Sequence, residues 1–416
     1  MDKDQGPIYD ALVPHPAVCR LIDRGVEIPH PEHVFIGDEV SLEAIEAGVR
    51  LDPGSRIEGS RTRIGAGSHL AFDGPVVLRD CALGRNVRLA SGTFRESLFH
   101  DGVSVGPAAQ VRSGTIMEEG ASAAHAVGLK QTILLPFVVL GSNVNFCDAL
   151  LAGGTGRDDH SEVGSGFIHF NFTPFGPRGD KATASLFGDV TRGVWLREKR
   201  IFLGGSGGVV GPVQIGYGTV LAAGSVYRSD REEDLLVLGE SLPGTSRPFE
   251  KGTLRRVLER VRKNLRYMAE VAALDAFYAE VRRRLVENDP LQRDLVAFGR
   301  GLLRGALAER RRQLLRLGEG LPAAIRALER KGCGAAVELQ DLRQATRLLE
   351  APLPETEDLL RETGAGDELA RLVESSPGAG LSCPQWVRAL PVAGVTGGRD
   401  ALERVTAAWL RAVESF

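Results

Sequence analysis

The chain has 416 residues, a length that predicts two or three domains, and its 43% content of apolar residues is enough for a folded core. With 51 Lys and Arg against 54 Asp and Glu, the net charge is −3, which argues against bulk binding of nucleic acid. The 51 glycines exceed the usual share of about 7%, and most of them precede residue 226.

The cysteines and the apolar runs bear on cellular location. The five cysteines are scattered and form no CxxC pair, which is typical of reduced thiols and argues against a disulfide framework or a zinc site. No apolar run approaches the ~18 residues of a membrane span, and the start MDKDQGPIYDALVPH lacks the pattern of a signal peptide. We therefore predict a cytoplasmic protein without membrane contact.

Residues 1–33 are polar and contain several prolines, which predicts an arm or a cap. From residue 34 to 230 the spacing of aliphatic residues becomes regular, most clearly in Ile201–Val226. A helix has a period near 3.6 and a strand alternates at 2, so a period of six fits neither. It fits a coil with three short flat sides, in which each side sends one aliphatic residue to the axis. The residues that show this period are Leu203, Val209, Ile215 and Leu221.

The same spacing returns upstream in pairs six residues apart, at Leu51 and Ile57, Ile64 and Leu70, Leu83 and Leu89, and Val105 and Val111. It predicts an all-β left-handed parallel β-helix of the hexapeptide-repeat type, with roughly ten turns of about 18 residues. A cap over its first turn would protect an open edge. The stretch 152–200 interrupts the pattern with many Gly, Pro and Asp residues, which predicts a protruding loop.

After residue 230 the composition changes again. Residues 231–250 are predicted to be a linker, and residues 251–416 show a helical period that predicts an all-α domain. This domain would brace the coil or recruit a protein partner. Its arginine runs, Arg282–Arg284 and Arg310–Arg312, could contact RNA or an acidic partner, but the favoured interpretation is that they are exposed, solvated faces of helices.

Four ordered motifs of the predicted coil resemble a known family. They are VRSG at Val111–Gly114, EGA at Glu119–Ala121 followed by VGLK at Val127–Lys130, GSGFIHFNF at Gly164–Phe172, and the final stretch Ile201–Val226. Together they are similar to the acetyltransferase half of the bacterial bifunctional N-acetylglucosamine-1-phosphate uridyltransferase/glucosamine-1-phosphate acetyltransferase. The resemblance covers about residues 34–230 and leaves out the helical domain.

The resemblance implies a set of roles and a homotrimer with its site between neighbouring coils. Arg112 and Lys130 would hold a sugar phosphate, for which a guanidinium fork is well suited. Asn171 and Phe172 would meet the substrate near the transferred acyl group. Lys181, with Arg178 beside it, matches a basic residue that follows in the family. Acetyl-CoA or another acyl-CoA would be the cosubstrate, and its contacts are assigned to Gly205 and Ala223.

The chain differs from the family at the position of the catalytic base and at two positions near it. The position of the catalytic histidine is Ser142, and a serine at its normal pKa does not serve as a general base near pH 7. The sugar-binding tyrosine of the family is Asn145 here, and an asparagine before the GAG motif is Glu162. Three interpretations stay open: loss of catalysis, a different substrate, or a base at a new position.

Three histidines are candidates for the relocated base. His169 lies two residues before Asn171 on one predicted strand, so alternation would place both side chains on one face. His160 lies in RDDHSE, which is a polar loop or, less in keeping with adjacent ligands, a metal site, and we predict no metal. His125 is interpreted as a residue of a coil corner.

The sequence thus leaves three functions open. The first is an acyl-CoA-dependent acyltransferase that acts on a phosphorylated or nucleotide-linked amino sugar, with His169 and Asn171 at its centre. The second is a scaffold that binds a sugar nucleotide without catalysis. The third is a sugar-1-phosphate nucleotidyltransferase, a UDP-N-acetylglucosamine pyrophosphorylase-like enzyme. Leu150–Asp159 resembles the glycine-rich loop of such enzymes, but its Thr precedes the third Gly and no helix is expected after it.

Overall fold

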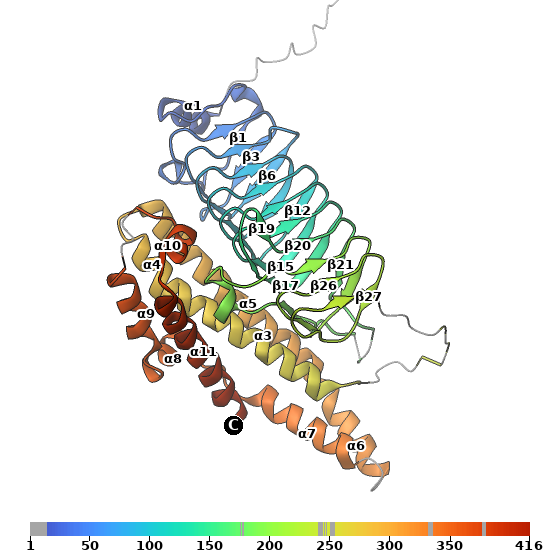
Figure 1. Ribbon diagram of the computed structural model, residues 1–416. Helices are drawn as coiled ribbons and strands as arrows, with labels where there is room; N and C mark the ends of the chain where they lie inside the picture. The colour runs from blue at the N-terminus through green and yellow to red at the C-terminus, as the bar shows by residue number, and fades with distance from the viewer. Residues whose placement is uncertain are drawn as a thin grey trace, which may run out of the picture.

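A coil of short parallel strands forms the first part of the chain, and a set of helices lies along one side of it (Figure 1). The computed structural model describes residues 15–174, 176, 179–239, 244, 246, 248–249, 254–331, 336–376 and 380–416. Arg178 and Cys333 lie outside the described residues, as do residues 1–14 of the predicted cap. The predicted left-handed parallel β-helix followed by a helical domain is confirmed.

The coil has three faces, named here by the order in which each turn visits them. Face 1 contains β1 (Phe35–Ile36), β3 (Ser55–Glu58), β6 (Val76–Arg79), β9 (Gly92–Arg95), β12 (Ala109–Val111), the first parts of β15 (Gly128–Leu134) and β17 (Asn145–Leu151), β21 (Ile168–Phe170), β24 (Gly208–Val210) and β27 (Val226–Tyr227). Face 2 contains β4 (Arg63–Ile64), β7 (Ala82–Leu83), β10 (Ser97–Phe99), β13 (Thr115–Met117), the second parts of β15 and β17, β22 (Ser185–Phe187) and β25 (Gln214–Ile215).

Face 3 is a ten-stranded sheet with one strand from each turn. Its strands are β2 (Arg50–Leu51), β5 (His69–Leu70), β8 (Arg88–Leu89), β11 (Ser104–Val105), β14 (Ser122–Ala123), β16 (Val139–Leu140), β20 (Glu162–Val163), β23 (Phe202–Leu203), β26 (Val220–Leu221) and β28 (Leu236–Val237). We call the three edges of the coil corner 1/2, corner 2/3 and corner 3/1, after the faces that meet there.

The six-residue period describes the core of this coil. Leu203, Val209, Ile215 and Leu221 each have an exposed fraction of 2% or less, because each is the inward residue of its strand. The corners need small residues where successive turns approach closely. A Cβ atom at Gly204 would lie 2.4 Å from the backbone nitrogen of Ala223 on the next turn, so only glycine fits there.

Within 152–200 the coil continues, and three insertions leave it. The first is an antiparallel hairpin of β18 (Gly154–Gly156) and β19 (Asp159–His160) at corner 2/3. The second, residues 171–184, leaves corner 1/2, and the third contains α2 (Val190–Gly193) at corner 2/3. Strands β20, β21 and β22 lie between them. Downstream, β28 pairs with β26, so the coil extends into the region expected to be a linker.

At the other end, α1 (Pro16–Asp23) packs against β1 and buries Ala17, Val18 and Leu21. Two 3₁₀ turns, Pro31–His33 and Leu42–Ala44, precede the regular turns of the coil.

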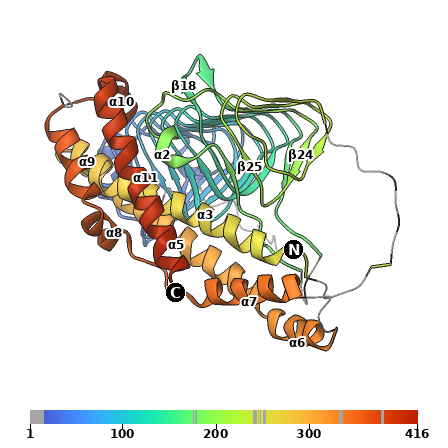
Figure 2. The same ribbon diagram turned by 60° about the horizontal axis from the view of Figure 1, so that its bottom comes forward.

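The helical domain covers face 2. It consists of α3 (Val257–Phe277), a π-helical turn (Tyr278–Arg282), α4 (Arg283–Leu285), α5 (Pro290–Gly318), α6 (Leu321–Lys331), α7 (Ala336–Glu350), α8 (Thr356–Glu362), α9 (Ala365–Glu374), α10 (Cys383–Ala389) and α11 (Val392–Glu414). Helix α5 contacts β7, β10 and β13, and α3 contacts β22. Figure 2 shows α3 and α5 along the same side of the coil. None of the described helices is both long and apolar enough to span a bilayer.

Buried ion pairs join the two domains, and they correct one interpretation of the sequence. Arg282 donates to Glu119 at 2.6 Å, and Arg310 donates to Asp148 at 2.6 Å. Both arginines are nearly enclosed, so the prediction that both runs are solvated faces is wrong for these two positions. It holds for their neighbour Arg312, which is exposed.

Candidate functional site

Corner 1/2 brings the predicted phosphate ligands together. Val111 pairs with Leu129, and Lys130 pairs with Cys147, so Arg112, Lys130 and Cys147 follow one another on successive turns. Neighbouring turns of such a coil are about 4.8 Å apart, which places these side chains in one column. The Nη2 atom of Arg112 lies 3.6 Å from the Cys147 sulfur. Burial raises the pKa of this thiol, so it remains neutral beside the two cations.

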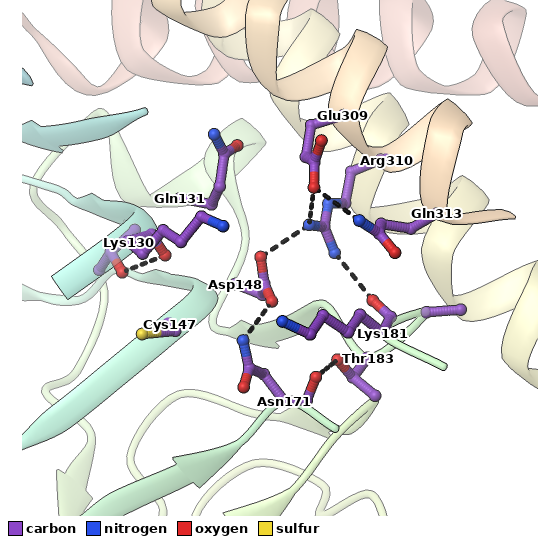
Figure 3. Close-up of polar contacts among 12 residues, drawn as sticks. Lys130, Gln131, Cys147, Asp148, Asn171, Lys181, Thr183, Glu309, Arg310 and Gln313 are labelled. Carbon is purple, nitrogen blue, oxygen red and sulfur yellow. Dashed lines mark hydrogen bonds and ion pairs between the residues drawn. The ribbon is translucent and has the colours of Figure 1, made fainter. Parts of the chain in front are cut away.

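The second insertion adds Lys181 to the same corner. In Figure 3 the amino groups of Lys130 and Lys181 both point toward the space beside Asp148. Arg112 and Lys181 are exposed and Lys130 is half-buried. None of these three cations forms an ion pair with a carboxylate among the residues that the structure describes. The corner therefore presents net positive charge that the surrounding described residues leave uncompensated.

Asn171 lies at this corner, but its amide is already engaged. Its Nδ2 atom donates to Asp148 Oδ2 at 2.6 Å, and its carbonyl oxygen accepts from Thr183 at 3.0 Å. On the other side of Asp148, Arg310 of α5 donates to Oδ1 at 2.6 Å and to the Lys181 carbonyl at 3.3 Å (Figure 3). The helical domain thus fixes Asp148, and Asp148 fixes Asn171.

His169 is enclosed in the coil, so the strand alternation that was expected to place it on one face with Asn171 does not hold. Its exposed fraction is 2%, and its ring is enclosed in the coil beside Phe146 and Phe187. Its Nδ1 atom is 2.6 Å from the Cys147 carbonyl oxygen, and its Nε2 atom is 2.7 Å from Ser185 Oγ. Burial lowers its pKa to about 4, so the ring is neutral at pH 7, and both of its nitrogens are used in hydrogen bonds within the coil. The chain turns at corner 1/2 between His169 and Asn171, which ends the strand alternation.

A different histidine is exposed, and it contacts the serine at the family's catalytic position. The Nδ1 atom of His125 lies 2.9 Å from Ser142 Oγ at corner 3/1, and Ser165 on the following turn accepts a hydrogen bond from the Ser142 backbone at 3.1 Å. Gly205 and Ala223 lie farther along the same corner. This corner therefore groups an imidazole with both positions assigned to acyl-CoA.

The remaining predicted residues are spread around the coil. Asn145 and Phe172 are exposed, the first on face 1 and the second in the insertion at corner 1/2. Glu162 is half-buried on face 3. His160 lies in the hairpin, with Nδ1 2.6 Å from the Arg157 carbonyl oxygen. Within the described ranges, no three His, Cys, Asp or Glu side chains are placed to share a metal ion.

The segment that resembles a nucleotidyltransferase loop has another structure. Leu150 and Leu151 are buried in β17, and the glycines that follow belong to the β18–β19 hairpin. The next helix in the described chain, α2, begins only at Val190, so no helix N-terminus follows this loop to receive a phosphate.

In one chain, the two groups lie at opposite edges of face 1. Arg112 and Lys130 are at corner 1/2, and the His125–Ser142 pair is at corner 3/1. Cys147 is five positions after Ser142, which at ~3.3 Å per residue gives a face about 16 Å wide. Sequence reasoning missed Asp148, Thr183 and Arg310. Asp148 lies three residues after the predicted Asn145 and Thr183 lies two after the predicted Lys181, whereas Arg310 reaches the site only through the docking of α5.

Comparison with known proteins agrees with the motifs. No family model matches the chain. It is 27% identical over 224 residues to the Bifunctional protein GlmU of Thermotoga petrophila, covering 53% of this chain and 44% of that relative. The protein of the same name from Carboxydothermus hydrogenoformans is 28% identical over 226 residues, with coverage of 53% and 44%. That of Methylococcus capsulatus is 27% identical over 235 residues, with coverage of 55% and 45%.

The chain therefore spans less than half the length of these curated relatives. Together with the β-helix, the matches support the resemblance given by the sequence motifs, over roughly half of the chain.

Proposed function

We propose that this protein binds a phosphorylated or nucleotide-linked amino sugar at corner 1/2 and transfers an acyl group to it from acyl-CoA. One observation carries the proposal: Arg112 and Lys130 lie on successive turns at corner 1/2, Lys181 lies near Lys130 (Figure 3), and none of the three has a carboxylate partner among the described residues. A phosphate supplies the missing negative charge, and its oxygens accept charge-assisted hydrogen bonds from such groups. The similarity to GlmU proteins directs the choice toward a sugar phosphate.

Corner 3/1 is suited to the acyl-transfer half of the reaction. Gly205 and Ala223 present only small groups, so a thioester donor can lie against the backbone. The exposed His125 is held at Nδ1 by Ser142, which leaves its other nitrogen free to take the proton of the acceptor amine. An imidazole is the commonest side chain for this task near neutral pH. His125 thus replaces His169 as our candidate base.

A homotrimer is part of this proposal. The helices cover face 2, whereas face 1 exposes Ile168 and Phe170, and face 3 exposes Val220 and Leu236. Packing face 1 of one coil on face 3 of the next buries these apolar side chains around a threefold axis. We expect a trimer by light scattering, and we expect Phe170→Glu to shift it to monomers. A monomeric wild-type protein would contradict this assembly.

The activity is tested by adding acetyl-CoA and glucosamine 1-phosphate and measuring release of free thiol. We expect turnover, and we expect His125→Ala to lower kcat by roughly 10²–10⁴, the usual contribution of a general base. The matched control is His160→Ala in the hairpin, which should keep the wild-type rate. Turnover that survives His125→Ala unchanged would remove His125 from the mechanism.

A non-catalytic scaffold is the second candidate, because Ser142 occupies the family's histidine position and His169 is enclosed. Thermal unfolding separates the two functions. Stabilisation by UDP-N-acetylglucosamine without stabilisation by acetyl-CoA, and without thiol release, would favour the scaffold.

A further inference from the structure

The column of cations at corner 1/2, which contains Arg112 and Lys130, is longer than the site described above. The register of β6 and β9 places Arg95 directly after Arg79. The register of β9, β12 and β15 continues the column to Arg112 and Lys130, so each of these four successive turns contributes one cation. Arg95 is exposed, and its side chain forms no ion pair within the ranges that the structure describes. It is a further cation of this corner, and nothing assigned so far uses it.

Arg79, at the start of this column, is compensated within the protein. Its Nε and Nη2 atoms donate to Glu58 Oε2 at 2.8 and 2.5 Å, and Arg56 donates to the other oxygen of the same carboxylate at 2.6 Å. Arg95 on the next turn has no such partner among the described residues. The available part of the column therefore begins at Arg95 and ends at Lys130, two turns farther along. With neighbouring turns about 4.8 Å apart, it extends over about 10 Å.

The acidic side chains of the same corner do not cancel these charges. Asp80 lies 3.5 Å from the guanidinium of Arg61, and Asp148 is already engaged by α5. Glu96 is exposed and forms no ion pair in the described part of the chain. The corner thus sets one unpaired carboxylate against four available cations, namely Arg95, Arg112, Lys130 and Lys181. The excess of positive charge favours a ligand whose negative charges are spread along the column.

The available cations divide into a group and a separate residue. The Nη2 atom of Arg112 lies 3.6 Å from the sulfur of Cys147, which is two turns farther along, so Arg112 leans away from Arg95. The amino groups of Lys130 and Lys181 point into the space beside the next residue of the Cys147 strand (Figure 3). These three cations form a group suited to one phosphate. Arg95 lies on the opposite side of Arg112, where it can meet a second negative group of the same ligand.

We propose that the substrate of corner 1/2 carries two phosphate groups, as a sugar linked to a nucleoside diphosphate does, and that Arg95 contacts the second. This proposal rests on the function proposed above and decides between its two classes of substrate. The phosphate on the sugar contacts Arg112, Lys130 and Lys181. The phosphate on the nucleoside lies toward Arg95, whose guanidinium fork suits phosphate oxygens. A sugar monophosphate uses the first group alone, so Arg95 determines specificity for the diphosphate.

Titration calorimetry on the full chain with two ligands tests the proposal. The probes are glucosamine 1-phosphate, which has one phosphate, and UDP-glucosamine, which has two. Both should bind the wild type, and UDP-glucosamine should bind more tightly. Arg95→Ala should raise the Kd of UDP-glucosamine roughly tenfold, as expected for the loss of one charge-assisted hydrogen bond, and leave that of glucosamine 1-phosphate unchanged. Arg112→Ala should raise both Kd values, because Arg112 belongs to the group that both ligands use.

Two further variants show whether the charge of Arg95 is responsible. Arg79→Ala is the matched control, because it removes an arginine of the same column that is already paired, and it should leave both Kd values unchanged. Arg95→Lys keeps the charge and should retain most of the affinity for UDP-glucosamine. If UDP-glucosamine keeps the same advantage over glucosamine 1-phosphate in Arg95→Ala as in the wild type, the advantage comes from the nucleoside and the proposal is overturned.

The outcomes separate this proposal from the function on which it rests. If both ligands bind the wild type but UDP-glucosamine binds no more tightly, or Arg95→Ala raises both Kd values equally, the second phosphate position is wrong and the sugar-phosphate site at corner 1/2 stands. If neither ligand binds the wild type, the function proposed for corner 1/2 fails, and the second phosphate position fails with it.

Discussion

The charged groups at corner 1/2 and those at the junction of the two domains differ in whether an opposite charge lies within reach. At the junction, Arg282 and Arg310 are enclosed and each contacts carboxylates at 2.6–2.9 Å. At the corner, the nearby Arg112, Lys130 and Lys181 have no carboxylate partner among the described residues. The first kind of cation is part of the folded structure, whereas the second kind is available to a ligand.

The contrast is sharpest around Asp148, where both kinds meet. Its carboxylate is fully used by Arg310 and Asn171, so it does not neutralise the two lysines that point toward it. The helical domain therefore does more than cover face 2. By supplying Arg310 it keeps Asp148 occupied and leaves the lysine charges for a phosphate.

The largest expected effect comes from removing a paired cation. Arg310→Met leaves Asp148 with an exposed fraction of only 3% and without its partner charge. We expect a loss of about 3–5 kcal/mol in the free energy of unfolding, measured by urea denaturation. The matched control is Arg312→Ala, two residues away and exposed, which should change stability by less than about 0.5 kcal/mol. Equal effects of the two substitutions would show that Arg310 is not held as described.

A somewhat smaller effect should appear as pH falls, because His169 is buried and neutral just inside the same corner. Its pKa is about 4 in the folded protein and about 6.5 when unfolded, so the unfolded state binds more protons between these values. Its contribution is fully present above pH ~6.5 and is lost as pH falls toward 4, by roughly 3 kcal/mol in total.

This contribution is isolated by comparing His169→Phe with the wild type in urea melts at several pH values. The variant should lose less stability than the wild type on acidification. The exposed His30→Phe serves as the control and should keep the wild-type slope. Parallel pH profiles of the wild type and His169→Phe would show that His169 titrates normally.

The smallest effect on stability is expected at the unpaired cations. Arg112→Ala and Lys130→Ala break no ion pair in the described structure and relieve repulsion between like charges. We expect the free energy of unfolding to change by no more than about 0.5 kcal/mol in urea melts. For the double variant at low salt, we expect a slight gain in stability. A loss of several kcal/mol would mean that these side chains hold the fold, and the contrast between the two regions would fail.

Much of the coil follows from the sequence, because one spacing governs both core and corners. Arg112 and Lys130 are 18 residues apart, which is one turn, so their shared corner is predictable. The same spacing shows where the prediction for His169 failed. His169 follows the inward Val163 by six residues, which is the inward position of the next strand, and strand alternation was the wrong rule to apply there.

The contribution of the helical domain was not accessible in this way. A helix turns by about 100° per residue, so the three consecutive arginines at 310–312 point in different directions and cannot all face the coil. Which arginine faces the coil depends on how α5 docks on face 2, and no local sequence pattern determines that docking. The pairing of His125 with Ser142 was likewise missed, although their separation of 17 residues is close to one turn.

Titration calorimetry with glucosamine 1-phosphate tests the central claim most directly, namely that the unpaired cations of corner 1/2 bind a sugar phosphate. Each charge-assisted hydrogen bond contributes about 1.5–3 kcal/mol, so Arg112→Ala and Lys130→Ala should each raise Kd by roughly 10–100-fold. The control Gln110→Ala, exposed on β12 two residues before Arg112, should leave Kd unchanged, and unphosphorylated glucosamine should bind at this corner far more weakly. Equal affinity in the wild type and in both cation variants would contradict the account.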